Sequence, residues 1–279
     1  MTSCNYTNSF LTSVLSRLVH FLVLRRSNLL VFNRRNTTAQ KKEEWVSLNS
    51  DVIVDLQSVS RIYDMGEIEV HALRGVSLQI KRGAAIGIMG PSGSGKTTLL
   101  NLIGALDRPT HGTVVLDNVD ITHMNESELT KVRRNKISYV FQFFNLLPVL
   151  TAYENVELPL LIGGVDEDAR KERVDHLLSL VGLTERADHR PDELSGGEQQ
   201  RIAIARALAK PAQSTKSVIV LADEPTGDLD YNTGQEILEI LVSLTKGEGG
   251  TLITVTHDPE VGDKMDRVYK MRDGQIENP

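Results

Sequence analysis

The feature that most constrains this chain is a charge-free apolar run followed at once by a glycine-rich turn. Residues 84–89 carry no charge, which predicts a strand buried on both faces. Residues 90–97 fit the pattern G-x-x-x-x-G-K-[ST], and residues 99–103 are apolar enough to continue as a helix. A strand, a glycine-rich turn and a helix in this order predict an α/β fold built around a phosphate-binding loop.

Each residue type in this loop has a physical role. Small residues let successive backbone N–H groups turn inward around a polyphosphate, and the helix N-terminus adds partial positive charge. Lys96 can reach the β- and γ-phosphates, and Thr97 offers a hydroxyl to Mg²⁺. The alternative is a Gly/Ser-rich loop that merely starts a helix. The predicted nucleotide-binding residues are Gly90, Pro91, Ser92, Gly93, Ser94, Gly95, Lys96, Thr97 and Thr98.

Two carboxylates follow the most apolar run in the part of the chain after residue 50. Residues 218–222 predict a fully buried strand, and Asp223 and Glu224 come directly after it. The carboxyl end of such a strand is where an α/β sheet places its ligands. Asp223 can therefore hold Mg²⁺, and Glu224 can polarise a water molecule. Two solvated charges at a strand end are the alternative.

Two further side chains are candidates because of their setting. Residues 251–256 predict the last buried strand, and His257 at its end is a candidate γ-phosphate contact, although a lone histidine is usually structural. Tyr63 lies between predicted strands at residues 52–56 and 76–80. Its ring could stack on adenine, because aromatic faces stack on bases. Judged alone, Tyr63 is better explained as a half-buried surface tyrosine.

The composition limits the function classes. The chain has 279 residues, 40% apolar and 24% charged, as expected for one large or two small globular domains. Cys4 is the only cysteine, which excludes an intramolecular disulfide and a cysteine metal site. The body after Glu43 is strongly acidic, which argues against nucleic acid as the main partner. No run of 18 apolar residues is present to span a bilayer.

The first part of the chain differs from the rest. Before Glu43 there are seven basic residues and no acidic one, and leucines recur at helical spacing opposite polar residues. This pattern is typical of an organelle transit peptide, with a disordered tail or a membrane-surface helix as alternatives. We therefore divide the chain into a basic extension at residues 1–50 and a body at residues 51–279.

Within the body, a stretch rich in helix signals interrupts the strands. Residues 143–193 carry Pro148, Pro159 and a predicted helix at residues 166–181, which indicates a helical subdomain inserted in the α/β body. The run Leu-Ser-Gly-Gly-Glu-Gln-Gln-Arg follows at residues 194–201, before a predicted helix at residues 202–209. A helix start after Ser-Gly-Gly can bind an oxyanion, although alone it would usually be only a cap.

Taken together, residues 51–274 resemble the ATP-binding subunit of an ABC transporter. The matching pieces are residues 90–97 (Walker A), Gln142 (Q-loop), residues 194–199 (the signature), residues 218–223 with Glu224 (Walker B and catalytic Glu), residues 229–230 (D-loop) and His257 (H-loop). Residues 142–148, 154–156, 222–227 and 271–274 look most like the bacterial lipoprotein-release and macrolide-export group, with a cell-division ATPase as a near relative. The stretch at residues 212–217 departs from that group by adding about six residues, which we expect to form a surface loop.

The resemblance implies a fold and a mechanism. The fold would be a P-loop ABC-type core with a parallel sheet, an antiparallel β subdomain and the inserted helical subdomain. Two chains would pair head to tail, and one would complete the ATP site of the other with Ser195, Gly196, Gly197, Glu198 and Asp230. Gln142 would sense Mg²⁺ and the attacking water. The implied catalytic residues are Glu224, His257, Gln142 and Lys96, and the implied metal ligands are Thr97, Gln142 and Asp223.

The resemblance also implies a setting. ATP and Mg²⁺ would be the cofactors, and separate transmembrane permease subunits would dock on the helical subdomain. The chain would be a peripheral protein on the nucleotide-containing face of a membrane, cytoplasmic or organellar. It would drive export or extraction of a lipoprotein, a lipid or a hydrophobic compound, and the cargo contacts would lie in the membrane subunits. A non-transport regulatory ATPase of the cell-division type is the alternative.

Other nucleotide-dependent classes fit less well. A GTPase would need an N-K-x-D base reader, and residues 135–138 have serine in the last place. A small-molecule kinase would lack the signature at Ser195. A DNA-repair ABC ATPase would place a long coiled coil between Gln142 and Leu194 and would present a basic surface.

Overall fold

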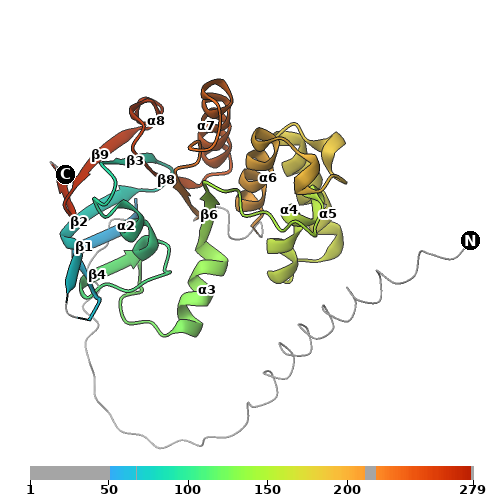
Figure 1. Cartoon of the computed structure of the whole chain (residues 1–279). Helices are drawn as coiled ribbons and strands as arrows, with labels where there is room; N and C mark the ends of the chain where they lie inside the picture. Colours follow the sequence, from blue (N-terminus) through green and yellow to red (C-terminus); the bar gives the residue numbers. More distant parts are fainter. Residues whose placement is uncertain (1–50, 67, 211–217, 278–279) are drawn as a thin grey trace, which may run out of the picture. The chain divides into compact units, whose positions relative to one another are not determined.

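The charge-free run at residues 84–89 forms a central strand of a six-stranded sheet in the computed structural model (Figure 1). The strand order is β10-β9-β3-β8-β7-β6, and every neighbouring pair is parallel except β9 and β10. The strands of this sheet are β3 (Ala85–Met89), β6 (Ile137–Phe141), β7 (Ile219–Asp223), β8 (Thr251–Thr256), β9 (Arg267–Arg272) and β10 (Gln275–Glu277).

Helices cover both faces of this sheet, as its apolar strands require. Along β7, Ile219 and Leu221 enter one hydrophobic core, whereas Val220 and Ala222 enter the other. Helix α2 (Lys96–Ile103) packs on the first face, and α7 (Tyr231–Gly247) packs against β8 on the second. The predicted α/β architecture is therefore confirmed.

A second sheet is antiparallel and lies on the other side of α2. Its order is β2-β1-β4-β5, and α2 contacts β2 and β4 as well as β7 and β8. The strands of this sheet are β1 (Val52–Asp64), β2 (Glu69–Lys81), β4 (His111–Leu116) and β5 (Val119–Asp120). Helix α2 is thus held between two sheets.

The prediction that Tyr63 lies between two strands is wrong. Tyr63 belongs to β1 and pairs with Val70 of β2 in a long hairpin. Register shifts interrupt the pairing after Leu56, and Ser58 takes a left-handed φ of 50°. These irregularities break the period-2 alternation of side chains beyond residue 56, where the predicted strand ended.

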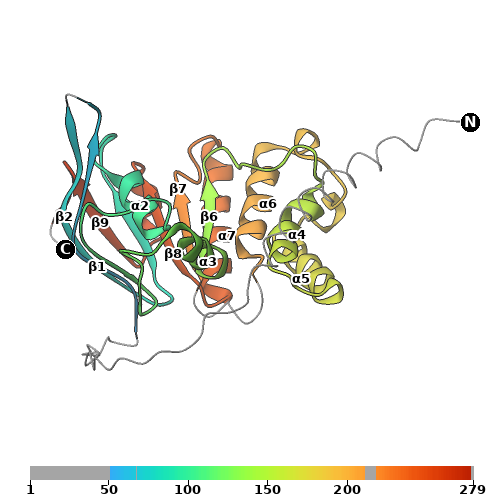
Figure 2. The ribbon, with the colours of Figure 1, turned by 90° about the horizontal axis from the view of Figure 1, so that it is seen from below.

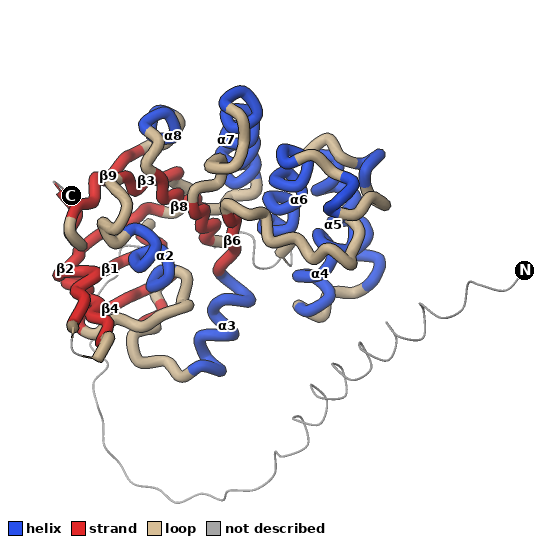
Figure 3. Tube along the Cα trace, in the orientation of Figure 1, coloured by secondary structure: helices blue, strands red, loops and turns tan. Residues whose placement is uncertain are grey.

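Between β6 and β7, all the regular elements of the described residues are helical. Helix α4 packs on α5 and α6, and Figures 2 and 3 show these three helices grouped beside the strands. The elements are α4 (Ala152–Ile162), α5 (Glu167–Leu180), η1 (Thr184–Arg186), η2 (Pro191–Glu193) and α6 (Gly196–Leu208).

Helix α6 begins earlier than the predicted residue 202. Ser195 is its N-cap, and Ser195 and Glu198 bond each other's backbone N–H in a capping box. Gly196 and Gly197 therefore lie inside the first turn of the helix. Two other helices had not been predicted, namely α3 (Glu126–Lys136) and α8 (Pro259–Asp263).

The structure describes residues 51–66, 68–210 and 218–277. The transit-peptide prediction for residues 1–50 and the surface-loop prediction for residues 212–217 fall outside these ranges. None of the helices within them combines the length and the apolar content that a membrane span needs.

One buried amide organises the chain just before α4. Asn155 is fully buried, and its Oδ1 accepts the Leu147 N–H at 2.8 Å. Its Nδ2 donates to the carbonyls of Leu147, Leu150 and Thr151. Asn155 thus fixes the segment that connects Gln142 to the helices.

We expect Asn155→Ala to lower the free energy of unfolding by about 2–4 kcal/mol, because it removes a fully buried amide and the four hydrogen bonds that this amide makes to partly buried backbone groups. Urea denaturation followed by circular dichroism measures this. Leu161→Ala, at a side chain 45% exposed on the same helix, is the control and should change little. Equal urea midpoints for the two variants would contradict the role given to Asn155.

Candidate nucleotide site

The polar candidates meet at one edge of the parallel sheet. The loop after β3, the carboxylates at the end of β7 and His257 after β8 border one cleft of about 730 Å³. Its lining residues are Val70, His71, Ala72, Pro91, Ser92, Gly93, Gly95, Lys96, Thr97, Thr98, Gln142, Asp223, Glu224, Gly227 and His257.

Two glycines of the loop are required by close backbone approach. A Cβ at Gly90 would lie 2.1 Å from the carbonyl oxygen of Met271. Gly95 has a left-handed φ of 100°, and a Cβ there would lie 2.5 Å from the carbonyl oxygen of Ala72. The loop can therefore run against β2 and β9 only with glycine at these positions.

The lysine of the loop is buried and directed along it. Lys96 is 8% exposed, and its Nζ donates to the carbonyl oxygens of Gly90 at 2.8 Å and Pro91 at 3.1 Å. Lys96 is also the first residue of α2, so its ammonium and the helix N-terminus act on the same cleft. Both favour a bound anion.

Asp223 supplies negative charge opposite this lysine. Burial raises the pKa of the Asp223 carboxyl above its usual range, and the neighbouring Glu224 carboxylate raises it further. A hydrogen bond from the Thr97 hydroxyl and the charge of Lys96 act in the opposite direction. Two carboxylates and a hydroxyl at one edge form the oxygen donor set that a hard cation prefers.

Glu224 is held in a defined orientation. Its backbone has a left-handed φ of 46°, and its N–H donates to the carbonyl of Val255. The Thr256 hydroxyl donates to Oε2 at 2.9 Å, and Nδ1 of His257 lies 2.8 Å from Oε1. The Glu224 side chain is 20% exposed and the His257 ring 73% exposed. The carboxylate is therefore accessible to a water molecule, while its two hydrogen bonds fix its orientation.

Gln142 enters the cleft from the end of β6. Its Nε2 donates to Oδ1 of Asp228 at 3.1 Å, and Gly227 lies against its amide. Two and three residues further on, Phe144 and Asn145 take left-handed φ values of 54° and 50°. Arg206 of α6 donates to both of their carbonyls. The segment after Gln142 is therefore tied to the helix that begins at the signature.

The signature residues lie outside this cleft. None of Ser195, Gly196, Gly197 and Glu198 is among its lining residues. Ser195 is exposed, and its hydroxyl donates to Glu198 Oε2 at 2.8 Å. The hydrogen bond from the Ser195 backbone N–H, together with this one, lowers the pKa of the Glu198 carboxyl. Asp230, also exposed, caps α7 by accepting the Thr233 N–H.

Tyr63 does not line the cleft either, but its paired residue does. Val70 is opposite Tyr63 in the hairpin and lines the cleft, so the two side chains share one face of the sheet. The Tyr63 hydroxyl donates to Asp107 at 2.8 Å, and the Arg61 guanidinium lies 4.4 Å from the ring centroid. The proposed adenine stacking stays a prediction.

Sequence reasoning missed several residues around the site. Thr256 and Asp228 hold Glu224 and Gln142, and each was within two residues of a motif that had been identified. Gln200 is fully buried and donates to the Pro225 carbonyl at 2.5 Å, which connects α6 to the segment after Glu224. His71, to which no role had been assigned, lines the cleft.

Comparison with known proteins identifies the family. The family described as "ABC transporter" matches residues 73–227. An ABC transporter ATP-binding protein of Thermotoga maritima is 51% identical over 225 residues, covering 81% of this chain and 94% of that protein. A protein of Brucella abortus named macrolide export ATP-binding/permease protein MacB is 44% identical over 224 residues. That match covers 80% of this chain but only 34% of MacB.

A solved structure agrees with the sequence comparison. The dimeric post-hydrolysis state of the ATP-binding cassette MJ0796 bound to ADP and Pi has a TM-score of 0.71 and 47% sequence identity. The match covers 81% of this chain and 97% of the MJ0796 chain. A protein named MJ0796 is from Methanocaldococcus jannaschii. With the Walker motifs at one cleft, these findings show that the chain belongs to the ABC transporter family and is an ABC-type ATPase.

Proposed function

We propose that this chain is the ATP-hydrolysing subunit that drives export or extraction of a lipoprotein, a lipid or another hydrophobic compound through separate membrane subunits. The observation that carries the proposal is the Glu224 carboxylate, fixed by Thr256 and His257 at the end of the cleft that holds Lys96. The MacB-type export relatives support the transport role.

In the proposed reaction, Glu224 accepts a proton from the water that attacks the γ-phosphate. The ring N–H of His257 and the Thr256 hydroxyl orient the two carboxylate oxygens, which leaves their remaining lone pairs for the water. Lys96 and the N–H groups at the start of α2 hold the phosphates and stabilise the charge that develops on them. Gln142 lines the same cleft and orients the water.

The residues at this edge fit Mg²⁺. Asp223 is a partly buried carboxyl beside a second carboxylate, and the Thr97 hydroxyl bonds to it. Mg²⁺ is usually held by one or two protein oxygens together with substrate phosphates, which matches this donor set. Thr97, Asp223 and the side-chain oxygen of Gln142 would hold the ion, which would neutralise charge on the phosphate oxygens.

The signature is proposed to act on a second copy of the chain. Ser195 is exposed and stands outside its own cleft, so its helix N-terminus is available to phosphates held elsewhere. The dimeric state of the MJ0796 cassette supports this pairing. In the proposed dimer, Ser195, Gly196, Gly197 and Glu198, together with Asp230, close the cleft of the partner.

The helices between β6 and β7, namely α4, α5 and α6, are proposed to bind the membrane subunits. Six exposed large apolar side chains lie on α4, on α5 and on the segment that precedes α4, and exposed apolar side chains of this kind are typical of an interaction site. They are Phe143, Leu147, Val149, Leu161, Ile162 and Leu180. Docking there would place the chain on the nucleotide-containing face of a membrane as a peripheral subunit, in the cytoplasm or, if residues 1–50 are a transit peptide, in an organelle.

We expect Glu224→Gln to retain ATP binding and to slow hydrolysis by about 10²–10⁴-fold, because an amide cannot accept the proton from water. Phosphate release by the purified protein measures the rate, and equilibrium dialysis measures binding. Glu239→Gln, at an exposed glutamate of α7, is the matched control. Undiminished hydrolysis by the Glu224→Gln protein would remove Glu224 from the catalytic role.

With ATP, the Glu224→Gln protein is expected to elute from gel filtration as a dimer. Adding Ser195→Arg should return it to a monomer that still binds ATP, because a bulky cation would occupy the position of the phosphate contact. Ser243→Arg, at an exposed serine of α7, should leave the dimer intact. A dimer that persists in the Ser195→Arg protein would contradict the composite site.

Replacing both Leu161 and Ile162 by glutamate is expected to leave the ATPase rate of the purified chain unchanged and to reduce its sedimentation with membranes of the source cells. The control replaces Met65 and Ile68, which are 73% and 67% exposed at the tip of the β1–β2 hairpin, in the same way. Equal loss of sedimentation in both double variants would refute a specific docking site on the helices.

A further inference from the structure

One carboxylate connects the aromatic candidate Tyr63 to the helix that carries the phosphate loop. Asp107 Oδ2 accepts hydrogen bonds from the Tyr63 hydroxyl and from Nε of Arg61, both at 2.8 Å. The Arg61 guanidinium also lies over the Tyr63 ring, 4.4 Å from its centroid. A single acceptor therefore fixes both the phenol and the cation stacked on it.

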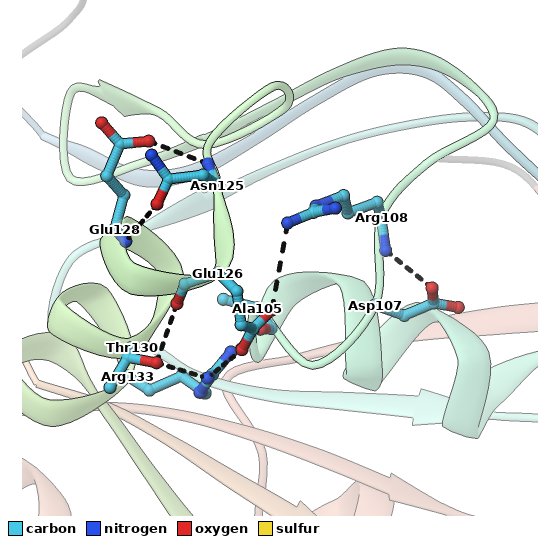
Figure 4. A network of polar contacts seen from close by, with 8 residues as sticks. All are labelled: Ala105, Asp107, Arg108, Asn125, Glu126, Glu128, Thr130 and Arg133. Carbon is cyan, nitrogen blue, oxygen red and sulfur yellow. Dashed lines mark hydrogen bonds and ion pairs between the residues drawn. The ribbon is translucent and has the colours of Figure 1, made fainter.

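Asp107 is itself held from the opposite side. It follows α2, and its Oδ1 accepts the backbone N–H of Arg108 at 2.7 Å (Figure 4). Arg133 of α3 donates to the Ala105 carbonyl at 2.6 Å, and Glu126 pairs with both Arg133 and Arg108 (Figure 4). The carboxylate is thus fastened to the loop that leaves α2.

The cluster lies beside the nucleotide cleft. Tyr63 shares a face of the hairpin with Val70, which lines the cleft next to the phosphate loop. Arg61 already covers one face of the Tyr63 ring, so a base can stack only on the other face. Lys96, at the phosphate end, is the first residue of helix α2, and Asp107, at the ring end, follows the last residue of that helix, Ile103.

We propose that Asp107 is a positioning residue that sets the Tyr63 ring, backed by Arg61, at a fixed place relative to the phosphate loop, so that adenine stacks on the face that Arg61 does not cover. The inference rests on the proposed stacking role of Tyr63. Fixing the ring before binding lowers the entropy lost when the nucleotide arrives. Asp107 then acts on the base and not on the phosphates.

The test compares two probes, ATP and inorganic triphosphate, on the purified full-length protein. Tyr63→Ala should weaken ATP binding about tenfold, the loss expected of one stacked base. Asp107→Ala should weaken it about fivefold, while kcat and the affinity for triphosphate stay unchanged. Asp107→Asn should recover most of the affinity, because its amide oxygen still accepts the tyrosine O–H.

Two further variants separate positioning from a general effect on folding. Combining Tyr63→Ala with Asp107→Ala should weaken ATP binding no more than Tyr63→Ala alone, because Asp107 then has no ring to place. Glu239→Ala removes an exposed ion-pair partner of Lys264 far along the chain and should leave both affinities unchanged.

The outcomes decide between the proposals. Equal weakening of ATP and triphosphate by Asp107→Ala, or additive losses in the double variant, would overturn the positioning role. Unchanged ATP affinity in Tyr63→Ala would overturn the stacking on which it rests. Neither result would affect the proposed catalysis, which fails only if Glu224→Gln hydrolyses ATP at the normal rate.

Discussion

A strand that is buried on both faces can present polar groups only where it ends, and this constraint determines where the chemistry of the chain lies. β3, β7 and β8 are parallel and buried along almost their whole length, so their carboxyl ends reach the surface together. Lys96, Asp223, Glu224 and His257 meet at that edge although more than 150 residues of sequence separate the first from the last. A polar group in the middle of one of these strands would be buried and could not contact a ligand in the cleft.

Patterns that depend on a strand, a loop and a helix in direct succession were therefore predictable from the sequence. The phosphate loop and the two carboxylates are local patterns, and the cleft brings them together as expected. Tyr63 was wrongly predicted to lie between strands, because the bulges of β1 interrupt the alternation of side chains by which a strand is recognised in a sequence. The supports of Glu224 and Gln142, Thr256 and Asp228, were not predictable because a hydroxyl or carboxylate one position from a motif carries no signal of its own.

The start of α6 shows that helix boundaries, too, could be predicted only in part from the sequence. Two glycines in succession argue against helix, so the predicted boundary fell after them. The capping box of Ser195 and Glu198 satisfies the first N–H groups and offsets that cost. At the other end of α6, Arg206 fixes the carbonyls of Phe144 and Asn145. A single rigid helix therefore connects the exposed signature to the segment that follows Gln142.

The left-handed backbone of Glu224 has a consequence for how this position can vary. Only glycine adopts a φ of 46° without steric cost, and any other residue type there gives up about 1 kcal/mol of folding stability. Glycine has no carboxylate to offer to the Thr256 hydroxyl or to a water molecule. The residue best suited to the backbone would thus remove the group to which the proposed hydrolysis assigns the proton, so backbone conformation and the proposed reaction make opposite demands on this position.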